Sequence, residues 1–223
     1  MGKSAASRKV RPRMPPADLA LILALDCSAS VTFDEFGLMA SGCAAALRHD
    51  AVMAGLPGGP GGASLCAVVI WSGIGAQDVV LEWTRLDSPA AIAAFADAVE
   101  NTPRSIRGAA TAIGEALAIC AGLLDLVPPA RRLVIDVVGD GRSNQGIAPE
   151  IVRDRLVDLG VTINGLCVLH EEPDLVEYYR ASVIGGPGAF AVWCETFQEF
   201  AVAMRQKLVR EIATGEAAPV GFG

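Results

Sequence analysis

The sequence predicts one α/β domain with a doubly wound, mostly parallel β-sheet and helices on both faces of the sheet. Apolar runs such as residues 19–25 alternate with helical patterns along the chain, which is typical of strand–helix–strand units. Hydrophobic residues make up 52% of the 223 residues, and the strand-like runs are continuously apolar. Strands of this kind are buried on both faces, as they are in parallel sheets.

The elements of the first part of the chain follow from local signals. Thr32 and Glu35 form a Thr-x-x-Glu capping box, which predicts a helix start shortly after the first strand. That helix should run to about Met53, so His49 is expected near its C-terminal end. Two later β-rich runs are joined by a short turn, which predicts a hairpin and one antiparallel edge strand. The predicted segments are strand 17–25, helix 32–53, loop 55–62, strand 64–72 and strand 78–86.

The remainder of the chain continues the alternation of strands and helices. The predicted segments are helix 89–100, helix 110–126, strand 132–138, helix 149–159, strand 162–169, helix 174–182, strand 189–194 and helix 197–212. The last helix carries Phe197, Phe200 and Leu208 at helical spacing, which indicates a face that packs on the core.

Charge divides the chain into an arm, a domain and a tail. Residues 1–16 hold five basic residues and no acid, so we expect a basic disordered arm. The remaining residues have 13 basic against 25 acidic side chains, a net charge of −12, which argues against binding of nucleic acid. No apolar stretch is long enough to span a membrane. We therefore expect one domain over residues 17–213 and a flexible tail over residues 214–223.

The cysteines bear on the cellular compartment. None of the six forms a Cys-x-x-Cys pair, and Cys66 and Cys167 fall inside apolar strands, so we expect buried free thiols and a reducing compartment. The sequence as given shows no signal peptide, which favours the cytoplasm; a misassigned start site would instead allow an exported, periplasmic protein. Cys27 is expected to be a small core side chain.

Oxygen-bearing side chains gather where two apolar strands end. Asp26, Ser28 and Ser30 follow the first strand, Asp140 follows the strand at 132–138, and Thr111 opens a predicted helix. Because the carboxyl ends of parallel strands meet at one edge of the sheet, we expect Asp26 and Asp140 to share a crevice. Two carboxylates and three hydroxyls suit Mg²⁺ or Mn²⁺, and neutral hydroxyl ligands leave the ion able to bind a third carboxylate. That carboxylate would be a Glu or Asp of a protein partner.

These residues resemble the metal-ion-dependent adhesion site of von Willebrand factor A-type domains. The family's Asp-x-Ser-x-Ser motif is complete at Asp26, Ser28 and Ser30, and its separate threonine and second aspartate resemble Thr111 and Asp140. The resemblance covers about residues 17–213 and points to a bacterial branch of uncharacterised A-type domains. It implies a six-stranded sheet in the order 3-2-1-4-5-6 with strand 3 antiparallel, and metal-mediated protein binding. We expect no catalytic activity, because no general base is evident beside the site.

Other interpretations of the same residues stay open. Asp26 could be the nucleophile of a phosphatase resembling haloacid dehalogenases, although that family needs a second aspartate where Ser28 stands. The serines could simply cap a helix and Asp140 could be a turn residue, in which case the domain is a metal-independent scaffold subunit. Thr102 competes with Thr111, but Pro103 follows it and no helix begins there.

Three residues near the predicted site are candidates for contact with the partner. Arg142 and Asn144 follow Asp140 closely, and His170 opens the acidic segment His-Glu-Glu-Pro-Asp after the strand at 162–169. Polar loops at this edge of a sheet often carry binding residues. The alternative is that the acidic segment is a solvated loop that takes no part in binding. We expect Arg142, Asn144 and His170 to form a rim around the metal.

Overall fold

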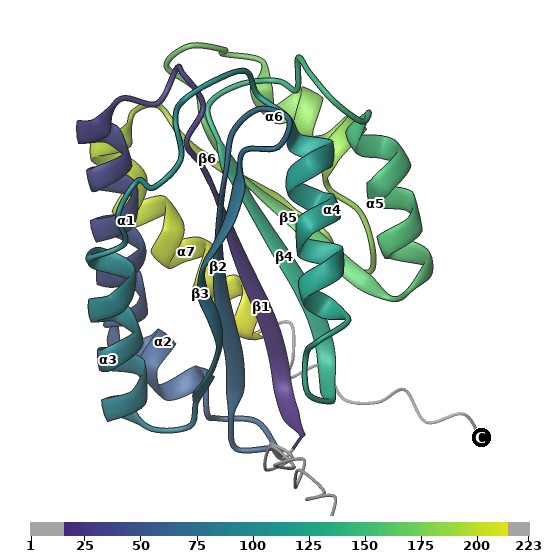
Figure 1. The fold of residues 1–223 in the computed structure, drawn as a ribbon. Helices are drawn as coiled ribbons and strands as arrows, with labels where there is room; N and C mark the ends of the chain where they lie inside the picture. Colours follow the sequence, from purple (N-terminus) through teal and green to yellow (C-terminus); the bar gives the residue numbers. More distant parts are fainter. Residues whose placement is uncertain (1–15, 214–223) are drawn as a thin grey trace, which may run out of the picture.

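A computed structural model describes residues 16–213, and its six-stranded sheet has the predicted order β3-β2-β1-β4-β5-β6 (Figure 1). β3 is antiparallel to β2, and every other neighbouring pair is parallel. The predicted basic arm and flexible tail lie outside the described residues, residue 16 excepted. The strands are β1 (Ala17–Asp26), β2 (Ser64–Trp71), β3 (Gln77–Leu86), β4 (Ala130–Gly139), β5 (Val161–Val168) and β6 (Ala191–Cys194).

Helices cover both faces of this sheet, as the doubly wound prediction requires. α1, α3 and α7 pack on one face, and α4 and α5 pack on the other (Figure 1). None of the helices in the described range is long and apolar enough to cross a membrane. The helices are α1 (Phe33–Leu47), α2 (Asp50–Gly55), α3 (Pro89–Glu100), α4 (Ile113–Leu124), α5 (Pro149–Asp158), α6 (Leu175–Tyr178) and α7 (Phe200–Ala213), with a π-helix η1 (Tyr179–Val183) and a 3₁₀ turn η2 (Phe197–Glu199).

Four predicted helices have different limits in the structure, and one of them, the predicted helix 197–212, is the 3₁₀ turn η2 followed by α7. The predicted helix 32–53 is two helices, because His49 adopts an extended backbone and its side chain accepts a hydrogen bond from Ala51 N, which makes it the N-cap of α2. The predicted helix 110–126 begins only at Ile113, so Thr111 lies in the preceding loop. The predicted helix 174–182 is α6 followed by the π-helix η1.

The central strands explain why the sequence is so apolar. Leu21, Leu23 and Leu25 of β1 face the core under α1, α3 and α7, whereas Ile22 and Ala24 face the core under α4. β1 lies between β2 and β4, so the chain's strand order reverses here. Ligands of doubly wound folds bind at this switch point, beyond the carboxyl ends of the strands.

All six cysteines are buried and unpaired, as the spacing predicted. Burial raises the pKa of the Cys27 thiol to about 12, so this side chain stays protonated in the core.

The edges of the sheet are poorly suited to pairing with another strand. β6 has four residues, and β3 carries exposed Asp78 and Glu82 and has an irregular register with β2. Short strands, charges and bulges are the features that prevent edge-to-edge association of sheets.

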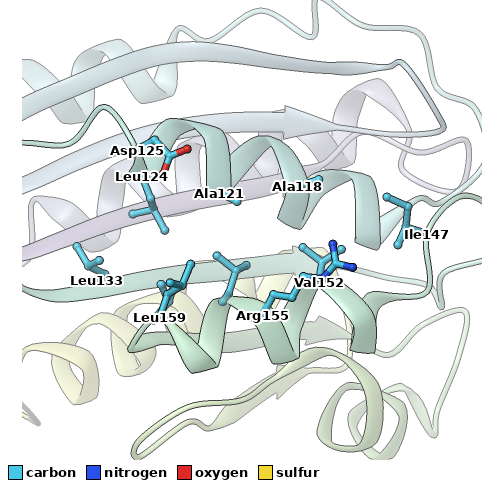
Figure 2. Close-up of a pocket in the computed structure, with 11 residues that line it drawn as sticks. Ala118, Ala121, Leu124, Asp125, Leu133, Ile147, Val152, Arg155 and Leu159 are labelled. Atoms are coloured by element: carbon cyan, nitrogen blue, oxygen red, sulfur yellow. The ribbon is translucent and has the colours of Figure 1, made fainter.

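A groove of about 490 Å³ lies between α4 and α5, over the amino-terminal ends of β4 and β5 (Figure 2). Ala118 and Ala121 of α4 line one side of it, Leu156 of α5 and Leu159 directly after α5 line the other, and Leu133 of β4 also contributes. None of the five predicted metal ligands lines this groove.

A buried ionic cluster joins α7 to the sheet. Lys207 of α7 contacts Asp136 of β4, and its Nζ lies 3.5 Å from Glu211 Oε2. Glu211 also accepts hydrogen bonds from Asn164 Nδ2 of β5 at 2.6 Å and from Arg132 Nη2 of β4 at 3.2 Å. Burial raises the pKa of Asp136, and Lys207 opposes that shift. The cluster was not foreseen, since a lysine in an amphipathic helix is ordinarily exposed.

Lys207→Met should destabilise the domain by about 3–5 kcal/mol, because it leaves Asp136 as an unpaired buried charge. Urea unfolding measures the loss. The double variant Lys207→Met/Asp136→Leu should recover much of the lost stability, and exposed Gln206→Met should stay within about 0.5 kcal/mol of the wild type. A double variant no more stable than Lys207→Met would contradict the ion-pair account.

Candidate metal centre

The loop after β1 is held in shape by hydrogen bonds from both sides. Asp26 Oδ1 accepts a hydrogen bond from Ser28 N at 2.6 Å, and the Ser28 and Ser30 hydroxyl oxygens are 3.1 Å apart. From outside the loop, Arg104 Nη2 donates to the carbonyl oxygens of Cys27 and Ser28 at 2.9 and 3.0 Å. The two serine hydroxyls are therefore brought to one side of the loop, as their spacing predicted.

Asp140 meets this loop from β4. Ser30 Oγ donates a hydrogen bond to Asp140 Oδ1 at 2.7 Å, which joins residues 110 positions apart in the sequence. Asp26 is the last residue of β1 and Asp140 directly follows β4, and both side chains are buried. The structure thus brings together four of the five predicted ligands through direct contacts: Asp26, Ser28, Ser30 and Asp140.

Thr111 approaches the same place from the loop before α4. Its backbone N–H donates to Asn144 Oδ1, and its carbonyl accepts from Asn144 N, both at 2.9 Å. The Thr111 hydroxyl oxygen lies 3.9 Å from the position that a Cβ on Gly141 would occupy, directly after Asp140. The competing Thr102 is engaged elsewhere, since its hydroxyl donates to Ala98 O at the end of α3.

The electrostatics of this centre are unfavourable in the protein alone. Burial, and then the nearby charge of Asp140, raise the pKa of Asp26 to about 8. Burial also raises the pKa of Asp140, and the hydrogen bond from Ser30 opposes that shift. Asp26 Oδ2 and Asp140 Oδ2 are buried and have no hydrogen-bond partner in the described part of the chain. Buried carboxylates are expensive unless a cation or hydrogen bonds compensate them.

The residues fit a hard divalent cation. Carboxylate and hydroxyl oxygens are the ligands that Mg²⁺ and Mn²⁺ prefer, and two carboxylates match the charge of one such ion. Over residues 16–213 no group of three or more His, Cys, Asp or Glu side chains is placed to hold a metal. A cation at this centre would therefore depend on the three hydroxyls as well as the two carboxylates.

The predicted rim residues all lie near the centre, but Arg142 and Asn144 are already engaged. Arg142 Nε donates to Glu172 Oε2 at 2.8 Å, its Nη2 donates to Asp174, and its guanidinium lies 5.3 Å from the centroid of the Tyr178 ring. Asn144 holds Thr111, as described above. Arg142 therefore joins the acidic segment to the loop after Asp140, and its guanidinium is already paired with two carboxylates.

His170 is only partly accessible. Its Nε2 lies 3.3 Å from Glu171 Oε1 and 3.8 Å from Glu35 Oε1, and its ring packs edge-on against Phe197. A quarter of its side-chain surface is exposed. Contact between this rim and a partner stays a prediction.

Two contributors to the centre were missed at the level of sequence. Arg104 supports the serine loop, and Ser72 Oγ accepts a hydrogen bond from Ala109 N at 2.8 Å, which supports the loop leading to Thr111. Neither belongs to a recognisable motif. The sequence offers a signal only for Ser72, which ends a predicted strand at the same edge of the sheet.

Comparison with solved structures shows which fold this is. The chain is similar to proximal thread matrix protein 1 from the mussel byssus, with 18% identity over 88% of this chain and 46% of that one and a TM-score of 0.61. A von Willebrand factor type A structure from Catenulispora acidiphila is 19% identical over 88% of this chain and 43% of that one, with a TM-score of 0.58. The vWF domain of the type V pili tip protein Mfa5 from Porphyromonas gingivalis is 9% identical, with coverage of 93% and 99% and a TM-score of 0.63.

The chain therefore has the von Willebrand factor A fold, as its motif predicted. It spans less than half the length of the mussel protein, one structure of which has a zinc-occupied MIDAS motif. No curated protein matches the chain. The family model that matches it, over residues 16–216, is described as a protein of unknown function, DUF1194, and the chain belongs to that family.

Proposed function

We propose that this domain binds Mg²⁺ or Mn²⁺ at the centre described above and, through the ion, an acidic side chain of a protein partner. The observation that carries the proposal is the hydrogen bond from Ser30 to Asp140. It holds the paired hydroxyls of Ser28 and Ser30, in the loop that begins at buried Asp26, against the buried carboxylate of Asp140. Each carboxylate keeps one oxygen without a hydrogen-bond partner among the described residues. A divalent cation would satisfy both oxygens and cancel both charges.

The five proposed ligands fall into two groups, charged and neutral. Asp26 and Asp140 would supply the two negative charges, and Ser28, Ser30 and Thr111 would supply neutral oxygens. The ion, when bound, supplies an electrophile for one further carboxylate, a Glu or Asp of the partner. The zinc-occupied MIDAS motif of the mussel protein supports metal binding by this fold, and the rim of Arg142, Asn144 and His170 would border the partner.

We propose binding without catalysis. A phosphatase that used Asp26 would need a second carboxylate two residues later, where Ser28 stands. Asp26 is also fully buried, and its Oδ1 is engaged by Ser28 N. If the phosphatase alternative were true, Mg²⁺ would stimulate hydrolysis of p-nitrophenyl phosphate by the wild type but not by Asp26→Asn.

Metal should stabilise the wild type against heat. With a Kd of roughly 1 mM, about 5 mM Mg²⁺ contributes ~1 kcal/mol and raises Tm by roughly 2–4 °C over the value in EDTA. Asp26→Ala should show no such shift, whereas Asp158→Ala, at the exposed end of α5, should retain it. Equal shifts in wild type and Asp26→Ala would contradict the proposed ligand set.

Metal binding should strengthen with pH. The folded-state pKa of Asp26, about 8, lies above its ordinary value, so without metal the folded state holds an extra proton between about pH 4 and 8 and loses stability as pH rises. The ion must displace that proton, so its apparent affinity should rise up to about tenfold per pH unit and level off above pH 8. Titration with Mn²⁺ at pH 6, 7 and 8 measures this trend, and a pH-independent Kd would contradict it.

Association with the partner should require both the ion and its ligands. Wild-type protein used as bait in Mg²⁺ should retain a partner that is released by EDTA and is not retained by Asp26→Ala. Retention that is indifferent to EDTA and to Asp26→Ala would favour the metal-independent scaffold.

A further inference from the structure

Two buried oxygens without hydrogen-bond partners face the same small space beside the proposed metal centre. A Cβ built on Gly139 would lie 2.9 Å from Asp26 Oδ2 and 2.9 Å from the Tyr179 hydroxyl oxygen. The two oxygens are therefore at most about 6 Å apart, twice that distance. Both atoms lack a hydrogen-bond partner among the described residues. Native proteins satisfy nearly all such buried groups, often with one ordered water.

Two glycines on neighbouring strands make room for the tyrosine. A Cβ on Gly165 of β5 would lie 2.6 Å from the Tyr179 ring, so the ring needs a glycine beneath it. Gly139 of β4 leaves the space that the hydroxyl faces. Tyr179 itself has no exposed surface and begins the π-helix η1, an irregularity that frequently occurs at functional sites. The Tyr179 hydroxyl and Asp26 Oδ2 therefore lie on the same side of Gly139, both beside the space that a Cβ there would fill.

We propose that Tyr179 is a positioning residue of the metal centre: its hydroxyl donates a hydrogen bond to one water held over Gly139, and that water donates to Asp26 Oδ2. A single water can bond two oxygens up to roughly 5.5 Å apart, and the separation of these two is at most about 6 Å. The inference rests on the proposed function, because it concerns how one proposed ligand is held ready for the cation.

The chemistry of the donor suits this role. Burial raises the pKa of Tyr179 well above its ordinary value, so the hydroxyl keeps its proton and acts as a donor. A donor directed at Asp26 Oδ2 would hold the carboxylate in one orientation before the cation binds. The remaining lone pairs of the carboxylate stay free for the ion. Outer-shell groups of this kind typically change metal affinity by about 10-fold or more.

Tyr179→Phe tests the proposal, because it removes the hydroxyl and keeps the ring. Titration of the whole chain with Mn²⁺ should show a Kd about 10-fold higher than that of the wild type. The Tm in EDTA should fall only slightly, because one hydrogen bond to water is lost. A merely structural tyrosine would give a lower Tm in EDTA with an unchanged Kd.

Gly139→Ala provides a second test, since its methyl group would occupy the space proposed for the water. It too should raise the Kd for Mn²⁺, whereas Gly122→Ala in α4, with no atom within 4 Å of the added Cβ, should leave the Kd unchanged. A Kd for Mn²⁺ equal to that of the wild type in Tyr179→Phe would overturn the inference and leave the proposed function standing. If Tyr179→Phe does not fold, the same result in Gly139→Ala would do so. A wild type that binds no Mn²⁺ would overturn both.

Discussion

The hydrogen bond from Ser30 to Asp140 is the contact on which the arrangement of this edge of the sheet depends. It links the loop after β1 to the residue after β4, which are adjacent strands separated by more than a hundred residues of sequence. The loops that carry Arg104, Thr111 and Asn144 are arranged around these two strand ends. The serines do not cap α1, whose N-cap is Thr32, and Ser30 instead donates to a buried carboxylate.

Two buried aspartates, Asp136 in β4 and Asp140 directly after it, have different surroundings. Asp136 faces Lys207, so a cation of the same chain compensates it. Asp140 lies four residues later beside Asp26, and in the described part of the chain no cationic side chain forms an ion pair with either carboxylate. Arg104 is close enough to lower the pKa of Asp26, yet its guanidinium bonds backbone carbonyl oxygens. The desolvation cost is thus compensated by a lysine at one position, whereas no counter-ion among the described residues compensates it at the other.

Much of this could be predicted from sequence, because strand ends and motif spacing are local properties. The apolar strands predicted the doubly wound sheet, and the resemblance of the motif supplied its strand order and the pairing of Asp26 with Asp140. The features that could not be predicted depend on tertiary contacts. His49 caps a second helix, Arg142 is paired with Glu172 and Asp174, and Lys207 is buried against the sheet. Each of these side chains would be exposed in an isolated helix or loop.

The edges of the sheet bear on how this domain can assemble with others. The charges and irregular register of β3 and the shortness of β6 leave neither edge a good template for another strand. Pairing of this sheet with the edge of another sheet is thereby disfavoured. A domain built in this way can be joined to other domains in a longer chain, or stored at high concentration, without its sheet fusing to that of a neighbour.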